Sequence, residues 1–427
     1  MLLIVNRVKV AAALVLTAFA LLLVPGAAPG GAGLSWAQEE APQEEVPQEG
    51  SPQGASGGEV PEPPETEVLS WALADAQSGE FLAGENPDEQ LPVGSVTKLM
   101  SVLVVTEEGV DLEDEVTIST DAESYVGGVY SNVGLISGER VTVRDLLVAS
   151  LVASGTEAVY ALAEYAGDGS VEQFVGMMNE EADSLGLEDT NFETPAGLDT
   201  NNSYASARDL TILTREVLED PLLAEIVDTQ QATISTQDRQ IEINNTNQLL
   251  STYPPATGVK TGTTPDAGAN LVASAESNDE SYIAVVIGAE DSDQRFLSSE
   301  ALLEYAFERY ERRPLVNQDE VYGEAALPYR PDETIQLAAS EEVVGLTDAG
   351  SEIERNVTTD EELPPSASAG EELGEVEVLV NGRNVGRSPL VATQGYEEAS
   401  LWRKATYTVG DLLGRLGGAV TSLFSGE

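Results

Sequence analysis

Two lysine motifs, far apart in the sequence, place the strongest constraint on how this chain folds. The 427-residue chain has four lysines, of which Lys9 and Lys404 lie near its ends. The other two lie in the short motifs Ser95-x-x-Lys98 and Lys260-Thr-Gly. A composition that nearly excludes lysine therefore keeps it in two motifs of the folded body. A fold that uses both motifs together must bring residue 98 close to residue 260.

Histidine and cysteine are absent from the chain. Without histidine, a Ser-His-Asp triad is impossible and the commonest general base for activating a serine is missing. Without cysteine there is no thiol nucleophile, no disulfide and no thiolate metal site, although carboxylates could still bind a metal. If the protein activates a hydroxyl without a metal, lysine is the natural base.

The chain is strongly acidic, with 75 Asp and Glu against 20 Lys and Arg and a formal net charge of −55. Such a surface repels nucleic acid and anionic membranes, and its self-repulsion strains a compact fold at low salt. We therefore exclude nucleic acid as a partner. Salt at 1 M shortens the Debye length to about 3 Å and would relieve the repulsion, so we hypothesise a saline habitat.

The N-terminal 66 residues have the pattern of an export signal followed by a spacer. Arg7 and Lys9 precede an apolar run over residues 10–24, and small residues lead to Ala37, where we expect cleavage. The alternative for residues 1–37 is an uncleaved membrane anchor, although the run is short for a span. In either case we expect the body outside the cytoplasm. Residues 38–66 have few apolar groups to bury and predict a flexible acidic, proline-rich linker.

Residues 67–313 predict an α+β domain. The stretch 96–108 is apolar on every side, which is typical of a helix in the middle of a domain. Helices are expected at residues 96–108, 143–153, 157–166 and 298–309. Strands are expected at residues 68–73, 80–83, 258–262, 270–275 and 282–288. Because the first and last strands are distant in sequence, we expect helices packed on an antiparallel sheet.

The last part of the chain predicts a small all-β domain and then a helix. Residues 314–398 read as short strands and turns, and Asn381-Gly382 is a strong hairpin signal. Residues 399–427 place apolar residues at helical spacing, with basic residues among them, and so predict an amphipathic helix in a membrane interface. The alternative is a helix that packs on its own β domain, and four glycines weaken any free helix.

The two motifs are suited to activating a serine. A serine at a helix N-terminus and a lysine three residues later share one helical face, which brings Ser95 and Lys98 within reach of each other. The amine must lose its proton, so we expect burial and a neighbouring cation, Lys260, to lower its pKa. On an edge strand, Lys-Thr-Gly would let a substrate backbone lie close. Backbone N–H groups near Ser95 and Thr263 would stabilise a tetrahedral oxyanion.

The body resembles the serine D-alanyl-D-alanine carboxypeptidases, the low-molecular-weight penicillin-binding proteins, from about residue 67 to the C-terminus. Ser-x-x-Lys and Lys-Thr-Gly are motifs of penicillin-binding proteins and of serine β-lactamases. The stretches that carry the resemblance are residues 91–100, 153–158, 197–199, 206–209, 258–262 and 268–275. It implies a penicillin-binding/β-lactamase-like transpeptidase fold. Taken alone, Ser-x-x-Lys is usually a helix cap with a solvated lysine.

The resemblance implies a role for each site residue. Ser95 would be the acylated nucleophile, Lys98 its base, and Ser154 the relay of a proton to the leaving D-alanine. The residues that would hold the substrate are Lys260, Thr261, Gly262, Thr263, Thr156 and Arg295, the last by helping to bind the terminal carboxylate.

Three positions leave alternatives open. Ser154 and Glu157 have the spacing of a capping box at a helix start, which alone would explain the serine. Arg295 could form a surface ion pair in so acidic a chain. Thr156 stands where the family usually has Asn, and its hydroxyl reaches less far than a carboxamide.

The sequence thus predicts an exported, membrane-associated carboxypeptidase that removes the terminal D-alanine of peptidoglycan stem pentapeptides through a Ser95 acyl-enzyme. It would work at the outer face of the cytoplasmic membrane or in the cell wall. β-Lactam antibiotics would acylate the same serine, and no metal or organic cofactor is called for. One alternative is a β-lactamase-like hydrolase. Another is a catalytically weak wall-binding scaffold, motivated by Thr156 and the separate β domain.

Overall fold

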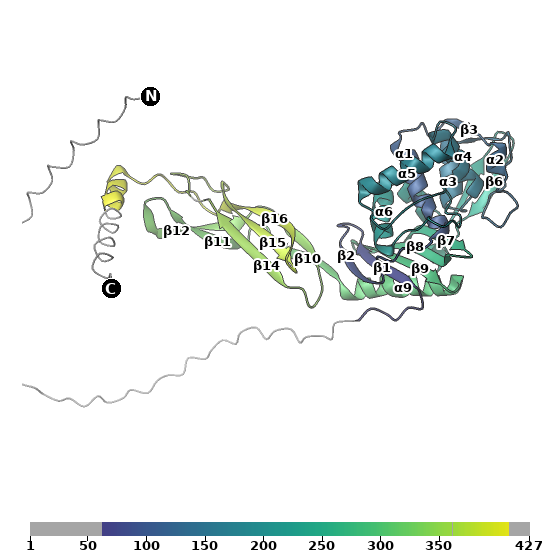
Figure 1. The fold of residues 1–427 in the computed structure, drawn as a ribbon. Coiled ribbons are helices and arrows are strands. Elements are labelled where there is room, and N and C mark those ends of the chain that lie inside the picture. Colours follow the sequence, from purple (N-terminus) through teal and green to yellow (C-terminus); the bar gives the residue numbers. More distant parts are fainter. Residues whose placement is uncertain (1–61, 361, 410–427) are drawn as a thin grey trace, which may run out of the picture. The chain divides into compact units, whose positions relative to one another are not determined.

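The computed structural model describes residues 62–360 and 362–409 (Figure 1). The expected signal (1–37), residues 38–61 of the expected spacer and residues 410–427 of the expected amphipathic helix lie outside the described residues. Within them, residues 70–309 form mixed helices and strands, and residues 311–392 form strands.

A five-stranded antiparallel sheet forms the base of the mixed part, in the order β2-β1-β9-β8-β7. Its strands are β1 (Ser70–Asp75), β2 (Phe81–Glu85), β7 (Ala256–Thr264), β8 (Gly268–Ser277) and β9 (Glu280–Ala289). The first two strands of the chain thus join the last three of this part. This confirms the prediction of an antiparallel sheet whose strands are distant in sequence. Strand β7 lies at one edge of the sheet.

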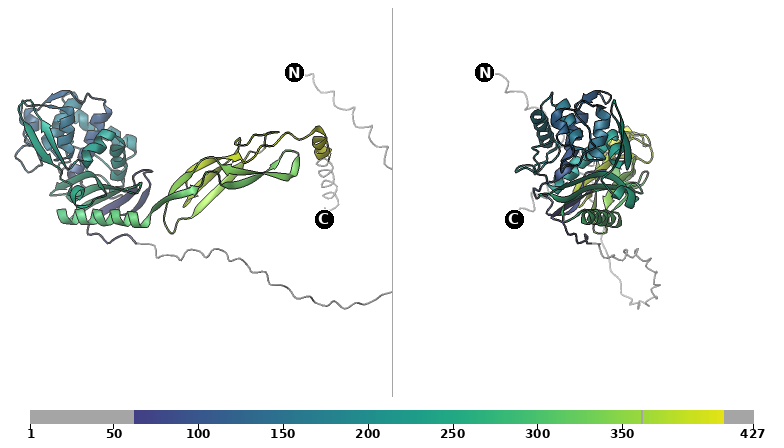
Figure 2. Two further views of the ribbon diagram at one scale, coloured as in Figure 1. Left: turned by 180° about the vertical axis from the view of Figure 1, so that it is seen from behind. Right: turned by 90° about the vertical axis from the view of Figure 1, so that its right-hand side faces the viewer.

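Both faces of the sheet are covered, so β1 is buried along its whole length and β8 and β9 are buried over most of theirs. Successive side chains of a strand point to opposite faces, and along β1 Ala72 packs in one hydrophobic core while Leu73 packs in another. Helix α9 (Ser292–Arg309) covers one face through Leu302 and Leu303. Most other helices of this part cover the opposite face (Figures 1 and 2), whereas Leu249 and Leu250 of α8 (Leu249–Thr252) pack in the same core as α9.

Besides α9, the mixed part holds eight α-helices among the described residues, together with two small hairpins. The helices are α1 (Lys98–Glu107), α2 (Thr120–Glu123), α3 (Val143–Leu151), α4 (Thr156–Ala166), α5 (Val171–Leu185), α6 (Ala207–Glu219), α7 (Pro221–Asp228) and α8 (Leu249–Thr252). The hairpins pair β3 (Glu115–Thr117) with β4 (Arg140–Thr142) and β5 (Gln231–Ser235) with β6 (Gln240–Asn244). Helices packed on an antiparallel sheet are therefore confirmed.

The remaining strands form an all-β part with its own hydrophobic core, which confirms the predicted β domain. A five-stranded sheet has the order β11-β12-β16-β15-β14, and β10 pairs with β13. The bounds are β10 (Glu311–Val316), β11 (Val321–Leu327), β12 (Arg330–Ala339), β13 (Val343–Thr347), β14 (Ile353–Thr359), β15 (Glu372–Val380) and β16 (Arg383–Ala392). Asn381 and Gly382, both with positive φ, connect β15 to β16 as the hairpin signal predicts.

The expected boundary between residues 313 and 314 falls inside a strand. Strand β10 runs through Arg313 and Pro314 and pairs with β13 of the β part. A boundary just before β10 would keep that strand whole.

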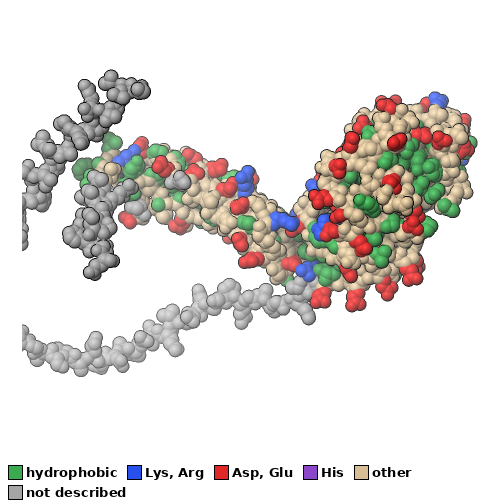
Figure 3. All heavy atoms as spheres, in the orientation of Figure 1, with side chains coloured by type: hydrophobic (Ala, Val, Ile, Leu, Met, Phe, Trp, Pro, Cys, Tyr) green, Lys and Arg blue, Asp and Glu red, His purple; other side chains and the backbone are tan. Residues whose placement is uncertain are grey.

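Residues 401–409 are helical and form the described beginning of the expected C-terminal helix. Leu401 and Trp402 are 86% and 79% exposed, and Val409 is 57% exposed. No helix among residues 62–360 and 362–409 is long and apolar enough to cross a membrane. Acidic side chains are spread over the visible face of the molecule, with few Lys and Arg among them (Figure 3).

Candidate active site

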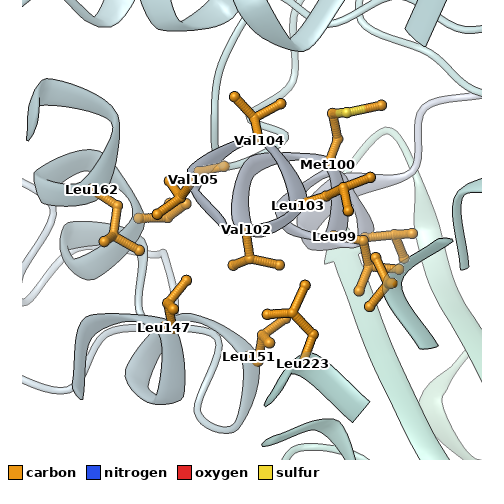
Figure 4. Close-up of a cluster of buried hydrophobic side chains, with 14 of the residues drawn as sticks. Leu99, Met100, Val102, Leu103, Val104, Val105, Leu147, Leu151, Leu162 and Leu223 are labelled. Atoms are coloured by element: carbon orange, nitrogen blue, oxygen red, sulfur yellow. The ribbon is translucent and has the colours of Figure 1, made fainter. Parts of the chain in front are cut away.

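The first motif is built on a buried helix. Residues 98–105 of α1 are all buried, as the apolar stretch predicts. Val102 and its neighbours on α1 lie among Leu147, Leu162 and Leu223 from other helices (Figure 4). A 3₁₀ turn over Gly94–Thr97 leads into α1, so Ser95 lies in this turn and Lys98 is the first residue of the helix.

Lys98 contacts two serine hydroxyls. Its Nζ lies 2.8 Å from Oγ of Ser95 and 3.5 Å from Oγ of Ser154, and its side chain is fully buried. Ser154 has a φ of +59°, a conformation that ordinary residues rarely adopt, and is itself buried. The alternative of a helix cap with a solvated lysine is wrong, because Ser95 makes no capping bond and Lys98 does not reach solvent.

The capping-box alternative for Ser154 is also wrong. Helix α4 begins at Thr156 after Gly155, and no side chain caps it. Glu157 turns away from the helix start: its Oε1 accepts the backbone N–H groups of residues 133, 134 and 135 at 2.7, 2.8 and 3.2 Å. Its other carboxylate oxygen is buried and has no hydrogen-bond partner among the described residues. Glu157 thus fixes a loop beside the site, a role that its sequence spacing does not indicate.

Thr156 is buried at the start of α4. Its backbone N–H donates to the carbonyl oxygen of Ser131 at 2.9 Å, so it ties the same loop to the site. Thr156, two residues after Ser154, thus lies next to a loop that Glu157 also holds.

The second motif lies on the edge strand β7. Lys260 is 1% exposed, and its Nζ donates to the carbonyl oxygen of Thr261 at 3.1 Å. Gly262 lies against the turn that carries Ser95: a Cβ at this glycine would come within 2.2 Å of the carbonyl oxygen of Val93. The strand and the serine turn can approach this closely only because residue 262 has no side chain.

Thr263 and Arg295 continue the site past Gly262. A guanidinium nitrogen of Arg295 on α9 donates to Oγ1 of Thr263 at 2.9 Å and to the carbonyl oxygen of Gly262 at 3.2 Å. Arg295 is buried, and no carboxylate among the described residues pairs with it. The alternative of a surface ion pair is therefore wrong. The backbone nitrogen of Thr263 would lie 3.2 Å from a Cβ placed on Gly94, so it is close to the serine turn.

Burial dominates the electrostatics of the two amines. It lowers the pKa of Lys98 to about 7, while the carboxylate of Glu157 acts in the opposite direction and raises it. Burial also lowers the pKa of Lys260 far below its usual range, and the positive charges of Lys98 and Arg295 lower it further. The expectation that burial lowers the pKa of Lys98 is met, but the expected lowering by the charge of Lys260 is not found. The charge that acts on Lys98 is the carboxylate of Glu157, which the sequence did not indicate.

No cluster of carboxylates able to hold a metal ion is found in the described part of the chain. What the site offers is a buried amine with a pKa near neutrality next to a hydroxyl, and a second buried amine on a neighbouring strand. This arrangement suits activation of the serine as a nucleophile without a histidine.

Comparison with known proteins places the chain in a family. Residues 58–291 match the model of the D-alanyl-D-alanine carboxypeptidase family, Peptidase S11, and residues 310–398 match the C-terminal domain of penicillin-binding protein 5. The chain belongs to the Peptidase S11 family of D-alanyl-D-alanine carboxypeptidases. The predicted resemblance is confirmed.

Relatives cover most of the chain. The chain is 31% identical over 353 residues to D-alanyl-D-alanine carboxypeptidase DacF of Bacillus subtilis, covering 81% of this chain and 90% of the relative. It is 32% identical to DacC of Escherichia coli, with 80% and 87% covered. The solved structure of penicillin-binding protein 5 from Haemophilus influenzae is similar with a TM-score of 0.62 and 30% identity, covering 79% of this chain and 99% of that one.

Proposed function

We propose that this protein is a serine-type D-alanyl-D-alanine carboxypeptidase that removes the terminal D-alanine from peptidoglycan stem pentapeptides. The observation that carries the proposal is the 2.8 Å separation between the buried amine of Lys98 and the hydroxyl of Ser95. Membership of the Peptidase S11 family supports the same reaction. A metal or an organic cofactor is not needed for any step of it.

Acylation begins when the neutral amine of Lys98 takes the proton of Ser95. The serine oxygen attacks the carbonyl carbon between the two D-alanines, a C–O bond forms, and the tetrahedral oxyanion is stabilised by the backbone N–H groups of Ser95 and Thr263. The C–N bond then breaks, and Ser154 passes the proton from Lys98 to the leaving amine. Ser154 lies within 3.5 Å of Lys98, which suits this transfer.

Deacylation uses the same groups in reverse. Lys98 takes a proton from water, the hydroxide attacks the ester carbonyl, and the C–O bond to Ser95 breaks as the serine regains a proton. The products are the peptide, shortened by one residue and ending in a carboxylate, and the free enzyme. Each proton taken by Lys98 is returned within one half-reaction, so the enzyme ends unchanged.

The substrate would lie along the edge strand β7. An extended peptide can add to an exposed sheet edge through main-chain hydrogen bonds, and Gly262 lets this edge strand lie close to the turn that carries Ser95. Its terminal carboxylate would accept the hydroxyl hydrogen of Thr261 and a hydrogen bond from the amine of Lys260, and be attracted by the positive charge of Arg295. Thr156 would contact the peptide from the helical side.

β-Lactam antibiotics would acylate Ser95 in the same way. If the protein were instead a β-lactamase-like hydrolase, it would release the opened penicillin rapidly, and a catalytically weak scaffold would form no adduct. The match of residues 310–398 to the C-terminal domain of penicillin-binding protein 5 favours a wall enzyme over a β-lactamase. Incubation with fluorescent penicillin, followed by mass analysis of the labelled peptide, tests the proposal: a long-lived adduct on Ser95 supports it, and no adduct overturns it.

Export and membrane association are part of the proposal. We assign residues 1–37 to a cleaved signal, 38–66 to a linker, 67–310 to the catalytic domain, 311–398 to the β domain and 399–427 to a helix that lies in the membrane interface, with the domain boundary placed before β10. The exposed Leu401, Trp402 and Val409 support an apolar contact at its beginning.

The alternative of a helix packed on its own β domain also has support at that end. The rings of Tyr407 and Tyr329 meet edge to face, and Arg403 pairs with Glu333 at 2.5 Å. Flotation of the mature protein with phospholipid vesicles, compared with a chain ending at residue 398, separates the two. Binding that is lost on truncation supports the membrane helix, and equal behaviour of the two chains supports the packed helix.

A further inference from the structure

A pair of hydroxyl groups joins the Lys-Thr-Gly strand to a loop on the helical side of the site. Thr246 lies in the short connection between β6 and α8. Its Oγ1 is 2.7 Å from Oγ1 of Thr261, and either oxygen could be the donor in this hydrogen bond. Within the described part of the chain, the hydroxyl of Thr246 has no other hydrogen-bond partner. Thr246 belongs to neither motif, and its sequence context does not single it out.

The backbone holds Thr246 in place independently of its side chain. Its N–H donates to the carbonyl oxygen of Val152 at 3.1 Å, two residues before Ser154. The side chain of Asn245 donates to the carbonyl oxygen of Thr229 at 2.9 Å and also accepts the N–H of Asn247 at 2.8 Å. The hydroxyl of Thr246 is therefore presented to β7 by a loop that is fixed on both sides of it.

A hydroxyl has one hydrogen to donate. Binding of the substrate therefore fixes which of the two threonine hydroxyls donates in the hydrogen bond between them. If Thr261 gives its hydrogen to the substrate carboxylate, its oxygen can only accept from Thr246. If Thr261 instead gave its hydrogen to Thr246, it would present only lone pairs to a negatively charged group. The productive order is thus Thr246 hydroxyl to Thr261 hydroxyl to carboxylate, and a donor that is itself an acceptor in a chain is polarised and strengthened.

We propose that Thr246 is a positioning residue that directs the hydroxyl hydrogen of Thr261 toward the terminal carboxylate of the substrate. The inference rests on the proposed function, because it needs a substrate that ends in a carboxylate. Thr246 does not touch the reacting atoms, so its loss weakens recognition of the carboxylate and leaves the attack by Ser95 intact.

Two variants separate the hydroxyl from the shape of the side chain. Thr246→Val keeps the volume and removes the hydroxyl, whereas Thr246→Ser keeps the hydroxyl. Each is assayed in the mature full-length protein with two peptide thioesters of the same acyl part. One has a thioglycolate leaving group with a free carboxylate, and the other has the uncharged carboxamide of that group. Thioesters are reactive enough for both rates to be measured.

For Thr246→Val we expect kcat/KM on the carboxylate thioester to fall by about five- to tenfold, the effect of one net hydrogen bond. The carboxamide thioester should stay within about twofold of wild type, and Thr246→Ser should stay close to wild type on both, by the same reasoning. Equal losses on both thioesters, no loss on either, or a Ser variant as impaired as the Val variant would overturn the inference. A wild-type protein that turns over neither thioester would overturn the proposed function itself, and the inference with it.

Discussion

The carbonyl oxygen of Val93 occupies the space that a side chain at Gly262 would need. A Cβ on Gly262 would come within 2.2 Å of this oxygen, which is backbone and cannot rotate away. The contact joins the turn that carries Ser95 to the strand that carries Lys260. The distance between the two motifs thus depends on a missing side chain.

Gly262→Ala should therefore force β7 away from the serine turn. We expect a loss of stability of about 1–3 kcal/mol, typical of overpacking a tight contact, and a reduced rate of Ser95 acylation by fluorescent penicillin. The matched control is Gly176→Ala on α5, where a Cβ meets nothing within 4 Å. This change should stabilise the protein by about 1 kcal/mol through helix propensity and leave acylation unchanged. Full acylation in the Gly262 variant would count against the tight contact.

Lys98→Arg tests the identity of the base. A guanidinium keeps its proton at any pH the protein survives, so it cannot accept the serine proton. We expect the rate constant for acylation by penicillin to fall by about 10²–10⁴-fold, the usual contribution of a general base. Lys404→Arg, in the helical segment 401–409, is the control and should acylate normally. Substantial acylation of the Lys98 variant would remove Lys98 from its role.

The pH dependence of the reaction follows from the pKa of Lys98. Burial lowers this pKa to about 7, and only the neutral amine can act as the base. The value of kcat/KM should therefore fall about tenfold for each pH unit well below 7 and level off above 7. A profile that is flat between pH 5 and pH 8 would contradict this account.

Glu157→Gln should shift the fall of kcat/KM at acid pH to lower pH. The charged groups that act on the two amines are the carboxylate of Glu157, which raises the pKa of Lys98, and the guanidinium of Arg295, which with Lys98 lowers that of Lys260. Removing the negative charge of Glu157 leaves Lys98 neutral at lower pH, while the amide oxygen can still accept the loop N–H groups. If Glu157 only held the loop in place, its replacement would lower kcat/KM above pH 7 without changing the pH at which kcat/KM falls. A shift of that pH therefore distinguishes the electrostatic role from a structural one.

Several site contacts could be anticipated from local sequence, and others could not. The stretch after Ser95 is apolar on every side, so it is stable only when it is buried in the middle of the domain. The Asn381-Gly382 pair suits a turn with positive φ at both positions. Glu157 misleads because Ser154-x-x-Glu157 has the spacing of a capping box. The positive φ of Ser154, which turns its side chain toward Lys98, depends on packing between distant elements.

The contacts of Thr246 and Arg295 also could not be predicted from local sequence. Thr246 acts through a hydrogen bond to Thr261, which belongs to another element, and a threonine in a loop has no local signal for this. The sequence indicated Arg295 only through the family resemblance, and its contact with Thr263 required α9 to lie under the sheet. By contrast, α5 was missed although Phe174, Met178 and Ala182 recur every four residues and mark its buried face.

Stability should rise with salt. The chain has a net charge of −55, and at 1 M sodium chloride the Debye length of about 3 Å screens repulsion between surface carboxylates. We expect the thermal unfolding midpoint of the mature protein to increase between dilute buffer and 1 M sodium chloride. An unchanged or lower midpoint would contradict the saline-habitat hypothesis.

A local variant tests the same repulsion. Burial, followed by the negative charges of Glu181 and Glu216, raises the pKa of Glu107. Because the pKa of Glu107 is raised in the folded state, Glu107 destabilises the protein at neutral pH and does so less as the pH falls toward that raised pKa. Glu181→Gln should raise the unfolding midpoint in dilute buffer more than in 1 M salt. An equal effect at both salt concentrations would show that the gain is not electrostatic.

The central claim is that Ser95, activated by Lys98, removes a terminal D-alanine. The most direct measurement incubates the mature protein with a pentapeptide that ends in D-Ala-D-Ala and determines the D-alanine released, alongside Ser95→Ala. The account predicts catalytic release of one D-alanine per peptide by the wild-type protein and none above background by the variant. No release by the wild-type protein, or equal release by both, would contradict it.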